Sequence, residues 1–293
     1  MRYYIGNSFM KLKPWIFSII ILCVVACTSK KNLIKYSKDY VEVGKVLNTV
    51  QLPYTLKFNK QNKQLLAVGF SHTYDISNPQ LNILKELFQE FNPDVSLNEG
   101  GQITKKFKDE KEAVTANGEP GMLKYLSDLN NKKLINGDTP DSLEYKIMLS
   151  KYSKDDLLLY YIMERLIGPY LYGAHRDRSI EDLYETVIQK WFINEGFPVD
   201  EDLWTFAGYK KLYHAKMGHD LELTINPDIE LFDYVNPDCK YCSIGRTSKI
   251  LRDSVLLEKI NTELKTHNNV MVVFGHGHIL AIEPALKKLM EKQ

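Results

Sequence analysis

The chain has 293 residues, of which 44% are apolar and 26% are charged, and its formal net charge is +1. This composition supplies enough apolar surface for a full hydrophobic core. Basic residues do not cluster in a stripe or alternate with aromatic ones, so we expect no nucleic-acid partner.

The first 26 residues have the pattern of a bacterial lipoprotein signal peptide. Three basic residues precede an apolar run at 15–26, which is too short to span a bilayer as a stable helix. The run closes on Ala26 and Cys27, which resembles a lipobox. We therefore expect cleavage after residue 26, lipidation of Cys27 and a protein anchored by lipid in the bacterial cell envelope, at the outer membrane. Removal of the signal changes the net charge from +1 to −2.

Beyond Cys27, the sequence predicts a tether followed by one domain. Residues 27–50 are polar and rich in lysine, as expected of a stalk between lipid and body. In the domain, residues 51–293, a buried strand at 64–68 is followed by an amphipathic helix at 79–91 and a second strand at 94–98. Strand, helix and strand at this spacing indicate a parallel crossover unit.

The remaining pattern indicates an α/β fold with a central, mostly parallel sheet flanked by helices. A third strand is predicted at 133–136. Residues 141–216 read as helical, which predicts a helical insertion in the middle of the chain. A helix at 248–266, a strand at 270–274 and a last helix at 282–292 complete the domain.

Two Gly-x-x-His motifs follow strand-like runs near the two ends of the domain. They are Gly69 with His72, and Gly275 with His278. A random order of 16 glycines and 7 histidines gives only about 0.4 such pairs. Ligands of α/β sheets bind beyond the carboxyl ends of the strands, so we expect both histidines at one site, on neighbouring strands. A lone histidine there would more often be structural, but the pairing favours function.

Glu99 and Arg252 are the other candidate site residues. Glu99 comes directly after the second strand, so its carboxylate should emerge beside His72 and His278. Two histidines and a carboxylate suit a divalent metal ion, or a general base with its orienting partner. Arg252, next to Asp253 in the penultimate helix, could stabilise an anionic intermediate or form a helix-surface pair.

Two further groups have weaker signals. Cys239 and Cys242 have the spacing of metal ligands, but no second pair completes a zinc site. In an exported protein a local disulfide is favoured over zinc, free thiols or a redox motif, the last because the pair is expected in a loop. His276, inside the second motif, is a secondary candidate.

These motifs resemble those of the TraB/GumN/Tiki superfamily, which is related to the erythromycin esterase and ChaN-like proteins. The resemblance rests on Gly69-x-x-His72, on residues 92–99 leading to Glu99, on the Arg252-Asp253 pair and on Gly275-x-x-His278. It implies an α/β fold with both histidine motifs at one active site. The central helical region is not diagnostic.

The resemblance also implies site residues and a range of activities. His72, Glu99 and His278 would form the site, with Arg252 as an auxiliary. Tiki-like members are metal-dependent peptidases, the esterase branch hydrolyses a lactone without a required metal, and the ChaN branch binds haem. An arginine often follows the glutamate in TraB-like sequences, but residues 100–102 are Gly-Gly-Gln here.

Three functions follow as hypotheses. The first is a lipid-anchored hydrolase of a peptide or small ester, in which His72, Glu99 and His278 bind Mn, Co or Zn or position water directly. The second is a lipoprotein that binds haem or a metal without catalysis. The third is an interaction module whose site has decayed.

Overall fold

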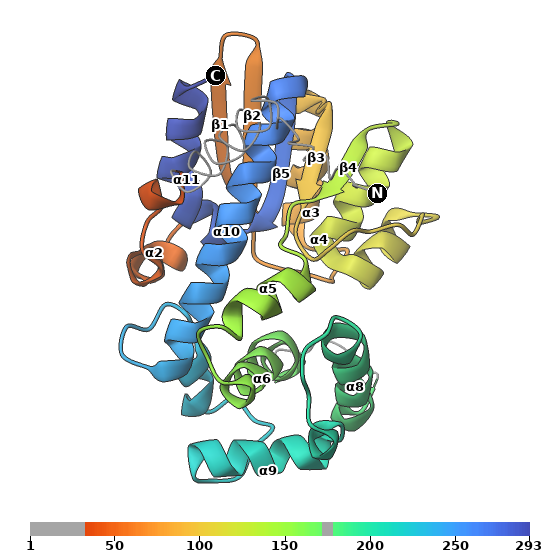
Figure 1. Ribbon diagram of the computed structural model, residues 1–293. Helices are drawn as coiled ribbons and strands as arrows, with labels where there is room; N and C mark the ends of the chain where they lie inside the picture. Colours follow the sequence, from red (N-terminus) through yellow and green to blue (C-terminus); the bar gives the residue numbers. More distant parts are fainter. Residues whose placement is uncertain (1–32, 172–177) are drawn as a thin grey trace, which may run out of the picture.

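The computed structural model describes residues 33–171 and 178–293. The expected signal peptide and Cys27 lie outside these residues. A sheet of five strands in the order β1-β2-β5-β3-β4 lies at the centre of the upper part of the molecule (Figure 1). Its strands are β1 (Tyr54–Lys60), β2 (Lys63–Phe70), β3 (Val95–Asn98), β4 (Lys133–Asn136) and β5 (Asn269–Gly275). Only the edge strand β1 is antiparallel to its neighbour. The predicted α/β fold with a mostly parallel sheet is therefore confirmed.

Helices cover both faces of the sheet, and alternate residues of each strand point to opposite faces. Leu66 and Val68 of β2 pack against α3 (Pro79–Phe91) and α4 (Glu110–Leu129). Leu65 and Ala67 pack on the other side against α10 (Lys240–Thr266) and α11 (His276–Glu291). The buried strands are apolar on both faces for this reason.

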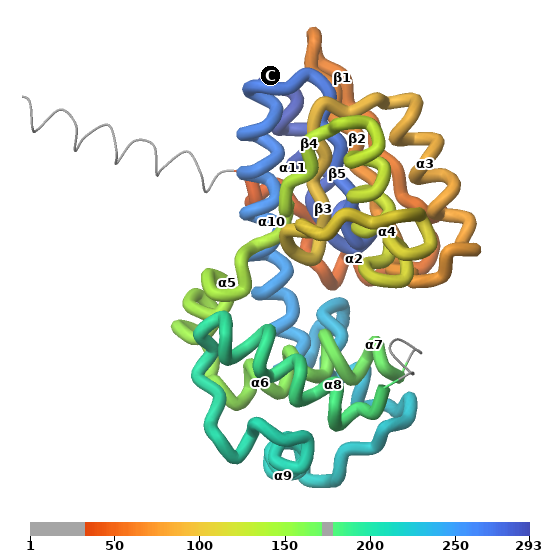
Figure 2. Tube along the Cα trace, turned by 90° about the vertical axis from the view of Figure 1, so that its right-hand side faces the viewer, coloured from red at the N-terminus to blue at the C-terminus, as the bar shows by residue number. Residues whose placement is uncertain are grey.

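A helical region follows β4 and lies beyond the carboxyl ends of the strands. Its elements are α5 (Asp141–Met148), α6 (Lys154–Ile162), η3 (Met163–Ile167), α7 (Gly168–Leu171), α8 (Ile180–Val187), η4 (Ile188–Ile193), η5 (Glu201–Leu203) and α9 (Phe206–Met217). The region forms its own layer, joined to the sheet by α5 and the long helix α10 (Figure 2). It occupies the range of the predicted helical insertion.

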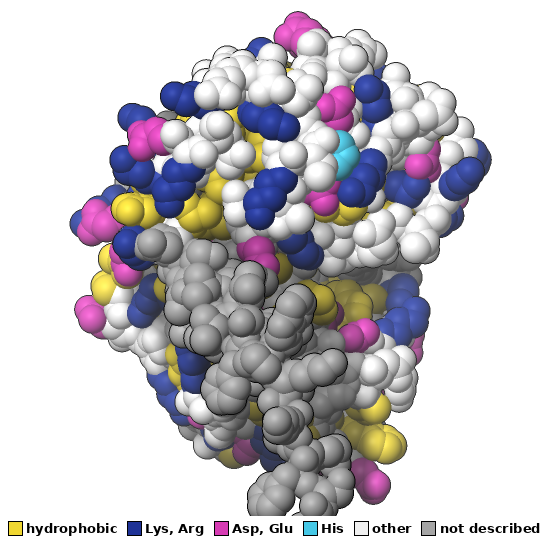
Figure 3. Space-filling model, turned by 45° about the horizontal axis from the view of Figure 1, so that its top comes forward, with side chains coloured by type: hydrophobic (Ala, Val, Ile, Leu, Met, Phe, Trp, Pro, Cys, Tyr) yellow, Lys and Arg dark blue, Asp and Glu magenta, His cyan; other side chains and the backbone are white. Residues whose placement is uncertain are grey.

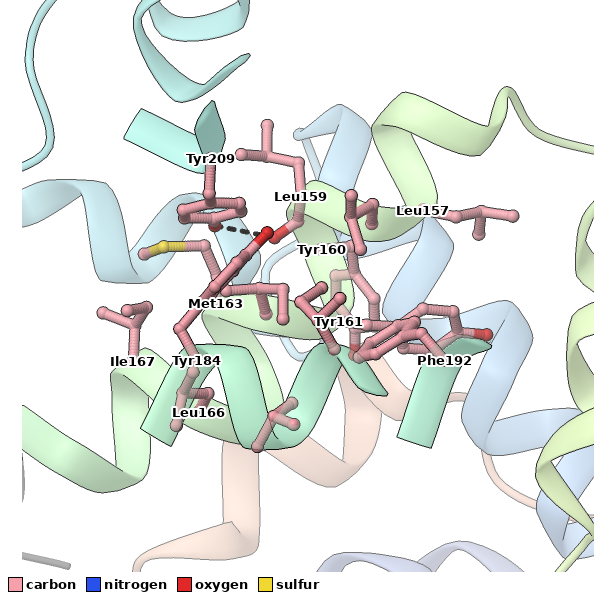
Figure 4. Packing of buried hydrophobic residues seen from close by; sticks show 14 of the residues in the cluster. Leu157, Leu159, Tyr160, Tyr161, Met163, Leu166, Ile167, Tyr184, Phe192 and Tyr209 are labelled. Carbon is pink, nitrogen blue, oxygen red and sulfur yellow. Dashed lines mark hydrogen bonds between the residues drawn. The ribbon is translucent and has the colours of Figure 1, made fainter. Parts of the chain in front are cut away.

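The helical region has an aromatic core of its own, shown in Figure 4. Tyr145, Tyr160, Tyr161 and Tyr209 are each at most 1% exposed. Buried tyrosines need partners for their hydroxyl groups, and Tyr209, for example, donates a hydrogen bond of 3.3 Å to the carbonyl of Leu159. This core gives the region enough rigidity to form one wall of a site.

The N-terminal segment differs from the expected tether. Residues 34–36 form the short helix η2 (Ile34–Tyr36), and residues 40–47 form α2 (Tyr40–Leu47). Tyr40 is 1% exposed and Val43 is fully buried, both against α11. The segment is polar overall, but Tyr40 and Val43 lie one helical turn apart on the same face of α2 and pack against the body.

Two helices begin earlier than the sequence predicts. α10 begins at Lys240 and not at residue 248, and the segment between the helical region and α10 contains the short helix η6 (Pro227–Phe232). Cys239 and Cys242 form the predicted local disulfide, but at the start of this helix and not in a loop. α11 begins at His276 directly after β5, which places His278 inside its first turn.

Two surface findings bear on the membrane and on partners. In the described ranges, no helix is long and apolar enough to cross a membrane. The end of the molecule with the β1–β2 turn carries lysine, arginine and acidic side chains in a mixed pattern (Figure 3). This mixture is typical of a solvated surface, and it lies at the opposite end of the sheet from the carboxyl ends of the parallel strands.

Candidate functional site

The carboxyl ends of β2, β3 and β5 bring the predicted site residues together. β2 pairs in parallel with β5, with Phe70 opposite Gly275, so the two Gly-x-x-His motifs lie on neighbouring strands as predicted. β3 pairs with the other side of β5 and ends at Asn98, one residue before Glu99. His72, Glu99 and His278 meet at this edge because the three strands end within two residues of one another, with Phe70 opposite Gly275 and Asn98 opposite Val273.

His72 is held by a glutamate that the sequence did not indicate. Its Nδ1–H donates a hydrogen bond to Oε1 of Glu119 in α4. Glu119 is 2% exposed, and its other oxygen accepts a hydrogen bond of 3.3 Å from the backbone N–H of Thr73. Gly118 has a positive φ of 61°, and a Cβ there would lie 2.7 Å from the Thr73 carbonyl, so a glycine allows α4 to approach this loop.

The contacts of His72 also change its protonation. Burial lowers the pKa of His72, but the carboxylates of Glu119 and Glu99 outweigh it and raise the pKa to about 9. The side chain is nevertheless 58% exposed, so its outer edge is open to the solvent and to a substrate. Nε2, the nitrogen not bonded to Glu119, lies 3.8 Å from Oε2 of Glu99.

Glu99 lies between the two histidines. Its Oε1 accepts a hydrogen bond of 2.6 Å from Nη2 of Arg252, and its Oε2 accepts one of 2.6 Å from the backbone N–H of Gly275. Nε2 of His278 lies 3.8 Å from Oε1. Burial raises the pKa of Glu99, but Arg252, His278 and His72 hold it well below its usual range, so this carboxylate is ionised at neutral pH.

His278 is more deeply buried than the sequence suggests. We expected it to project over the sheet edge like His72, but it is only 3% exposed and lies behind Glu99. Its Nδ1 donates a hydrogen bond of 2.6 Å to Oδ1 of Asp253. Its Nε2 is buried and has no hydrogen-bond partner among the described residues. The early start of α11 explains the difference, because it places His278 in the first turn of a helix that packs on the sheet and not in an open loop.

Arg252 binds two carboxylates at once. Besides Glu99, it donates hydrogen bonds of 2.8 and 2.7 Å from Nε and Nη2 to the two oxygens of Asp138. Nη1 donates no hydrogen bond to any described residue, and the side chain lines a cavity. Asp253, its neighbour, is 1% exposed and supports His278, so the two residues are not a surface pair.

The two motif glycines have different roles. A Cβ on Gly69 would lie 2.7 Å from Cα of His276, so this glycine allows α11 to start close to β2. A Cβ on Gly275 would lie 3.1 Å from Nε2 of His72 and 3.3 Å from Oε2 of Glu99, so this glycine leaves room for the site. His276 itself bonds the carbonyl of Phe70 at 3.0 Å, which is a structural contact.

A cavity of about 440 Å³ opens on this cluster, between the sheet edge and the helical region. His72, Glu99 and Arg252 lie on its sheet side. Among the residues that the structure describes, six carboxylates line its walls, namely Glu99, Glu119, Asp138, Asp141, Glu144 and Glu164. From the helical region, Arg165 lies 2.9 Å from Glu144, and Trp191 lines the same cavity. The insertion thus closes the site from the far side.

The described residues fit the proposed metal ion only in part. Both histidines have their Nδ1 bonded to a carboxylate and their Nε2 free, as metal-ligating histidines do. Both oxygens of Glu99, however, already accept hydrogen bonds, one from the cation of Arg252. Among the described residues no group of three or more His, Cys, Asp and Glu side chains is arranged to hold a metal ion. A haem, an apolar ring with anionic propionates, does not suit walls with six carboxylates.

Sequence reasoning missed two carboxylates of the site. Asp138 comes two residues after β4, at the same strand edge, so the rule that located Glu99 would also have found it. Glu119 lies in α4, a helix with an internal break at Gly118 that the sequence did not predict, and no spacing connects it to His72.

Comparison with known proteins gives no match: no family model, no curated protein and no solved structure matches the chain. The resemblance to the TraB/GumN/Tiki superfamily therefore remains a prediction from the motifs.

Proposed function

We propose that the protein is a hydrolase that adds water to the carbonyl of an amide or an ester. The observation that carries the proposal is the pair of carboxylate-supported imidazoles on either side of the ionised Glu99, at the inner end of a cavity. In its neutral form, a histidine with a carboxylate on Nδ1 is fixed in the tautomer that leaves Nε2 able to accept a proton. Only His72 of the two lies on the cavity wall, so it is the general base.

His72 and Arg252 can together carry out the proton transfers and the charge stabilisation that this hydrolysis needs. Nε2 of His72 removes a proton from a water molecule while the water oxygen attacks the carbonyl carbon. Nη1 of Arg252 donates to the oxyanion that forms. When the intermediate collapses, the imidazolium returns the proton to the departing nitrogen or oxygen. Glu99, close to both imidazoles, stabilises the positive charge on His72 during these steps.

A matched pair of histidine variants tests this proposal. His72→Ala should lower kcat/KM by about 10²–10⁴-fold in a screen of peptide and small-ester substrates. His214→Ala is the control, because the side chain of His214 is also 58% exposed and lies 2.8 Å from Asp220, but outside the cavity. Equal activity of the two variants would refute the role of His72. The lipid anchor at Cys27 stays part of the proposal, and mass spectrometry of the mature chain tests it.

A metal-dependent form of the site is the second candidate. The two free Nε2 atoms of carboxylate-supported histidines favour it, with Mn, Co or Zn near Glu99. Elemental analysis of protein purified without a chelator distinguishes it, since a bound metal would be present in a stoichiometric amount. A haem-binding protein would instead show a visible absorption band that His72→Ala shifts.

A further inference from the structure

The N-terminal segment contributes a buried hydroxyl group to the supports of His278. Tyr40, in α2, donates a hydrogen bond of 2.7 Å to Oδ2 of Asp253. The same hydroxyl lies 3.1 Å from Nδ1 of His278. The three side chains come from α2, α10 and α11, and none is more than 3% exposed. A hydroxyl, a carboxylate and an imidazole thus form one closed network behind Glu99.

The network fixes the direction of the histidine ring. Oδ1 of Asp253 accepts a hydrogen bond of 2.6 Å from Nδ1 of His278, so Nε2 faces Glu99. Tyr40 occupies the other oxygen of Asp253, which prevents the carboxylate from rotating away. Burial and the Asp253 carboxylate hold the pKa of Tyr40 well above its ordinary value, so its hydroxyl remains a donor.

The segment that carries Tyr40 is attached to the body at several points. The backbone N–H of Lys38 donates a hydrogen bond of 2.8 Å to the carbonyl of Ala281. Its side chain forms a salt bridge of 2.6 Å with Glu283, and Val43 packs fully buried beside α11. Figure 1 shows α2 next to α11, at the end nearer the helical region. A passive stalk would need none of these contacts.

We propose that Tyr40 is a positioning residue of this site, and that the segment at 33–47 completes it by holding Asp253 and His278 in place. The inference rests on the proposed hydrolase function. Its consequence is that a chain shortened to the expected domain at residues 51–293 loses part of the active site and not only a tether. Removal of residues that orient the ligands of metal sites costs about 10- to 100-fold in activity, and we expect an effect near the lower end of this range here.

Tyr40→Phe in the full chain tests the proposal, because the change removes one hydroxyl and keeps the ring. We expect kcat to fall about tenfold with KM unchanged, since His278 does not line the cavity. In proton NMR, the Nδ1–H resonance of His278 should move and exchange faster with water. Its assignment follows from its loss in His278→Gln.

Two controls separate positioning from general stability. Tyr36→Phe removes a hydroxyl that forms no hydrogen bond with any described residue, and should leave kcat and the resonance unchanged. Val43→Ala loosens the packing of α2 but keeps the hydrogen bonds. If Tyr40→Phe behaves like either control in both measurements, the proposal is wrong. If the wild-type protein hydrolyses nothing, the proposed function fails, and the NMR comparison alone decides the role of Tyr40.

Discussion

Glu119 accepts a hydrogen bond from Nδ1 of His72 although the two residues are 47 positions apart and lie on different elements. This contact fixes the ring orientation of an exposed loop histidine, which we propose as the general base. It also places a buried negative charge beside the imidazole, which favours the protonated ring. The activity of the site should therefore depend strongly on pH.

The first prediction concerns this dependence. Because the pKa of His72 is raised to about 9 and a general base must be neutral, kcat/KM should rise with pH through about 9. Glu119→Gln keeps an acceptor for Nδ1 but removes the charge, so the midpoint of the rise should move to lower pH. A pH profile of both proteins measures the shift. A midpoint that is the same in both would contradict the role of Glu119.

The same pKa gives a prediction for stability. A group whose pKa is raised by folding stabilises the folded state while it is protonated. The contribution of His72 is therefore fully present below its ordinary pKa of 6.5 and is lost as the pH rises through about 9. Thermal unfolding at a series of pH values should show the wild type losing its advantage over His72→Gln across that window. A constant difference between the two proteins would count against the raised pKa.

Replacement of the second histidine should affect stability more than replacement of the first. His278 is 3% exposed, and His278→Ala leaves the buried Asp253 without its imidazole partner and opens a cavity. We expect a loss of about 3 kcal/mol in the free energy of unfolding. His72→Ala should cost less, because that side chain is 58% exposed. Urea unfolding of both variants gives the comparison, and equal losses would contradict the different burial.

Substitutions of the two motif glycines should also differ in their effects on stability and on activity. Gly69→Ala places a Cβ 2.7 Å from the backbone of His276, so it should lower the unfolding midpoint. Gly275→Ala instead crowds Nε2 of His72 and Oε2 of Glu99. It should reduce kcat while the midpoint changes less than in Gly69→Ala. Activity and thermal unfolding of the two variants test this. A larger loss of stability in Gly275→Ala than in Gly69→Ala would contradict the different roles of the two glycines.

The sequence predicted the parts of the fold that follow from local periodicity. The helix Pro79–Phe91 and the strand Lys133–Asn136 have the predicted bounds, because their apolar spacing and end residues act locally. The sequence placed the candidate site at the strand ends because His72 and Glu99 follow buried strands. Glu119 and Tyr40 could not be found in this way, since their roles depend on which helices pack against the strand ends.

The last prediction concerns metal ions. Arg252 places a permanent positive charge 2.6 Å from Oε1 of Glu99, and the N–H of Gly275 occupies the other oxygen. A second cation at Glu99 would be repelled by the guanidinium and would have to displace these donors. We therefore expect that dialysis against EDTA leaves kcat/KM unchanged, and that added Mn, Co or Zn does not raise it. Arg252→Ala should remove this exclusion of the metal, because it frees Oε1 of Glu99 while the Nε2 atoms of both histidines keep no hydrogen-bond partner among the described residues. Calorimetry with Zn should then show binding that the wild type lacks. Activity that disappears with EDTA and returns with one of these metals in the wild type would instead establish the metal-dependent form of the site.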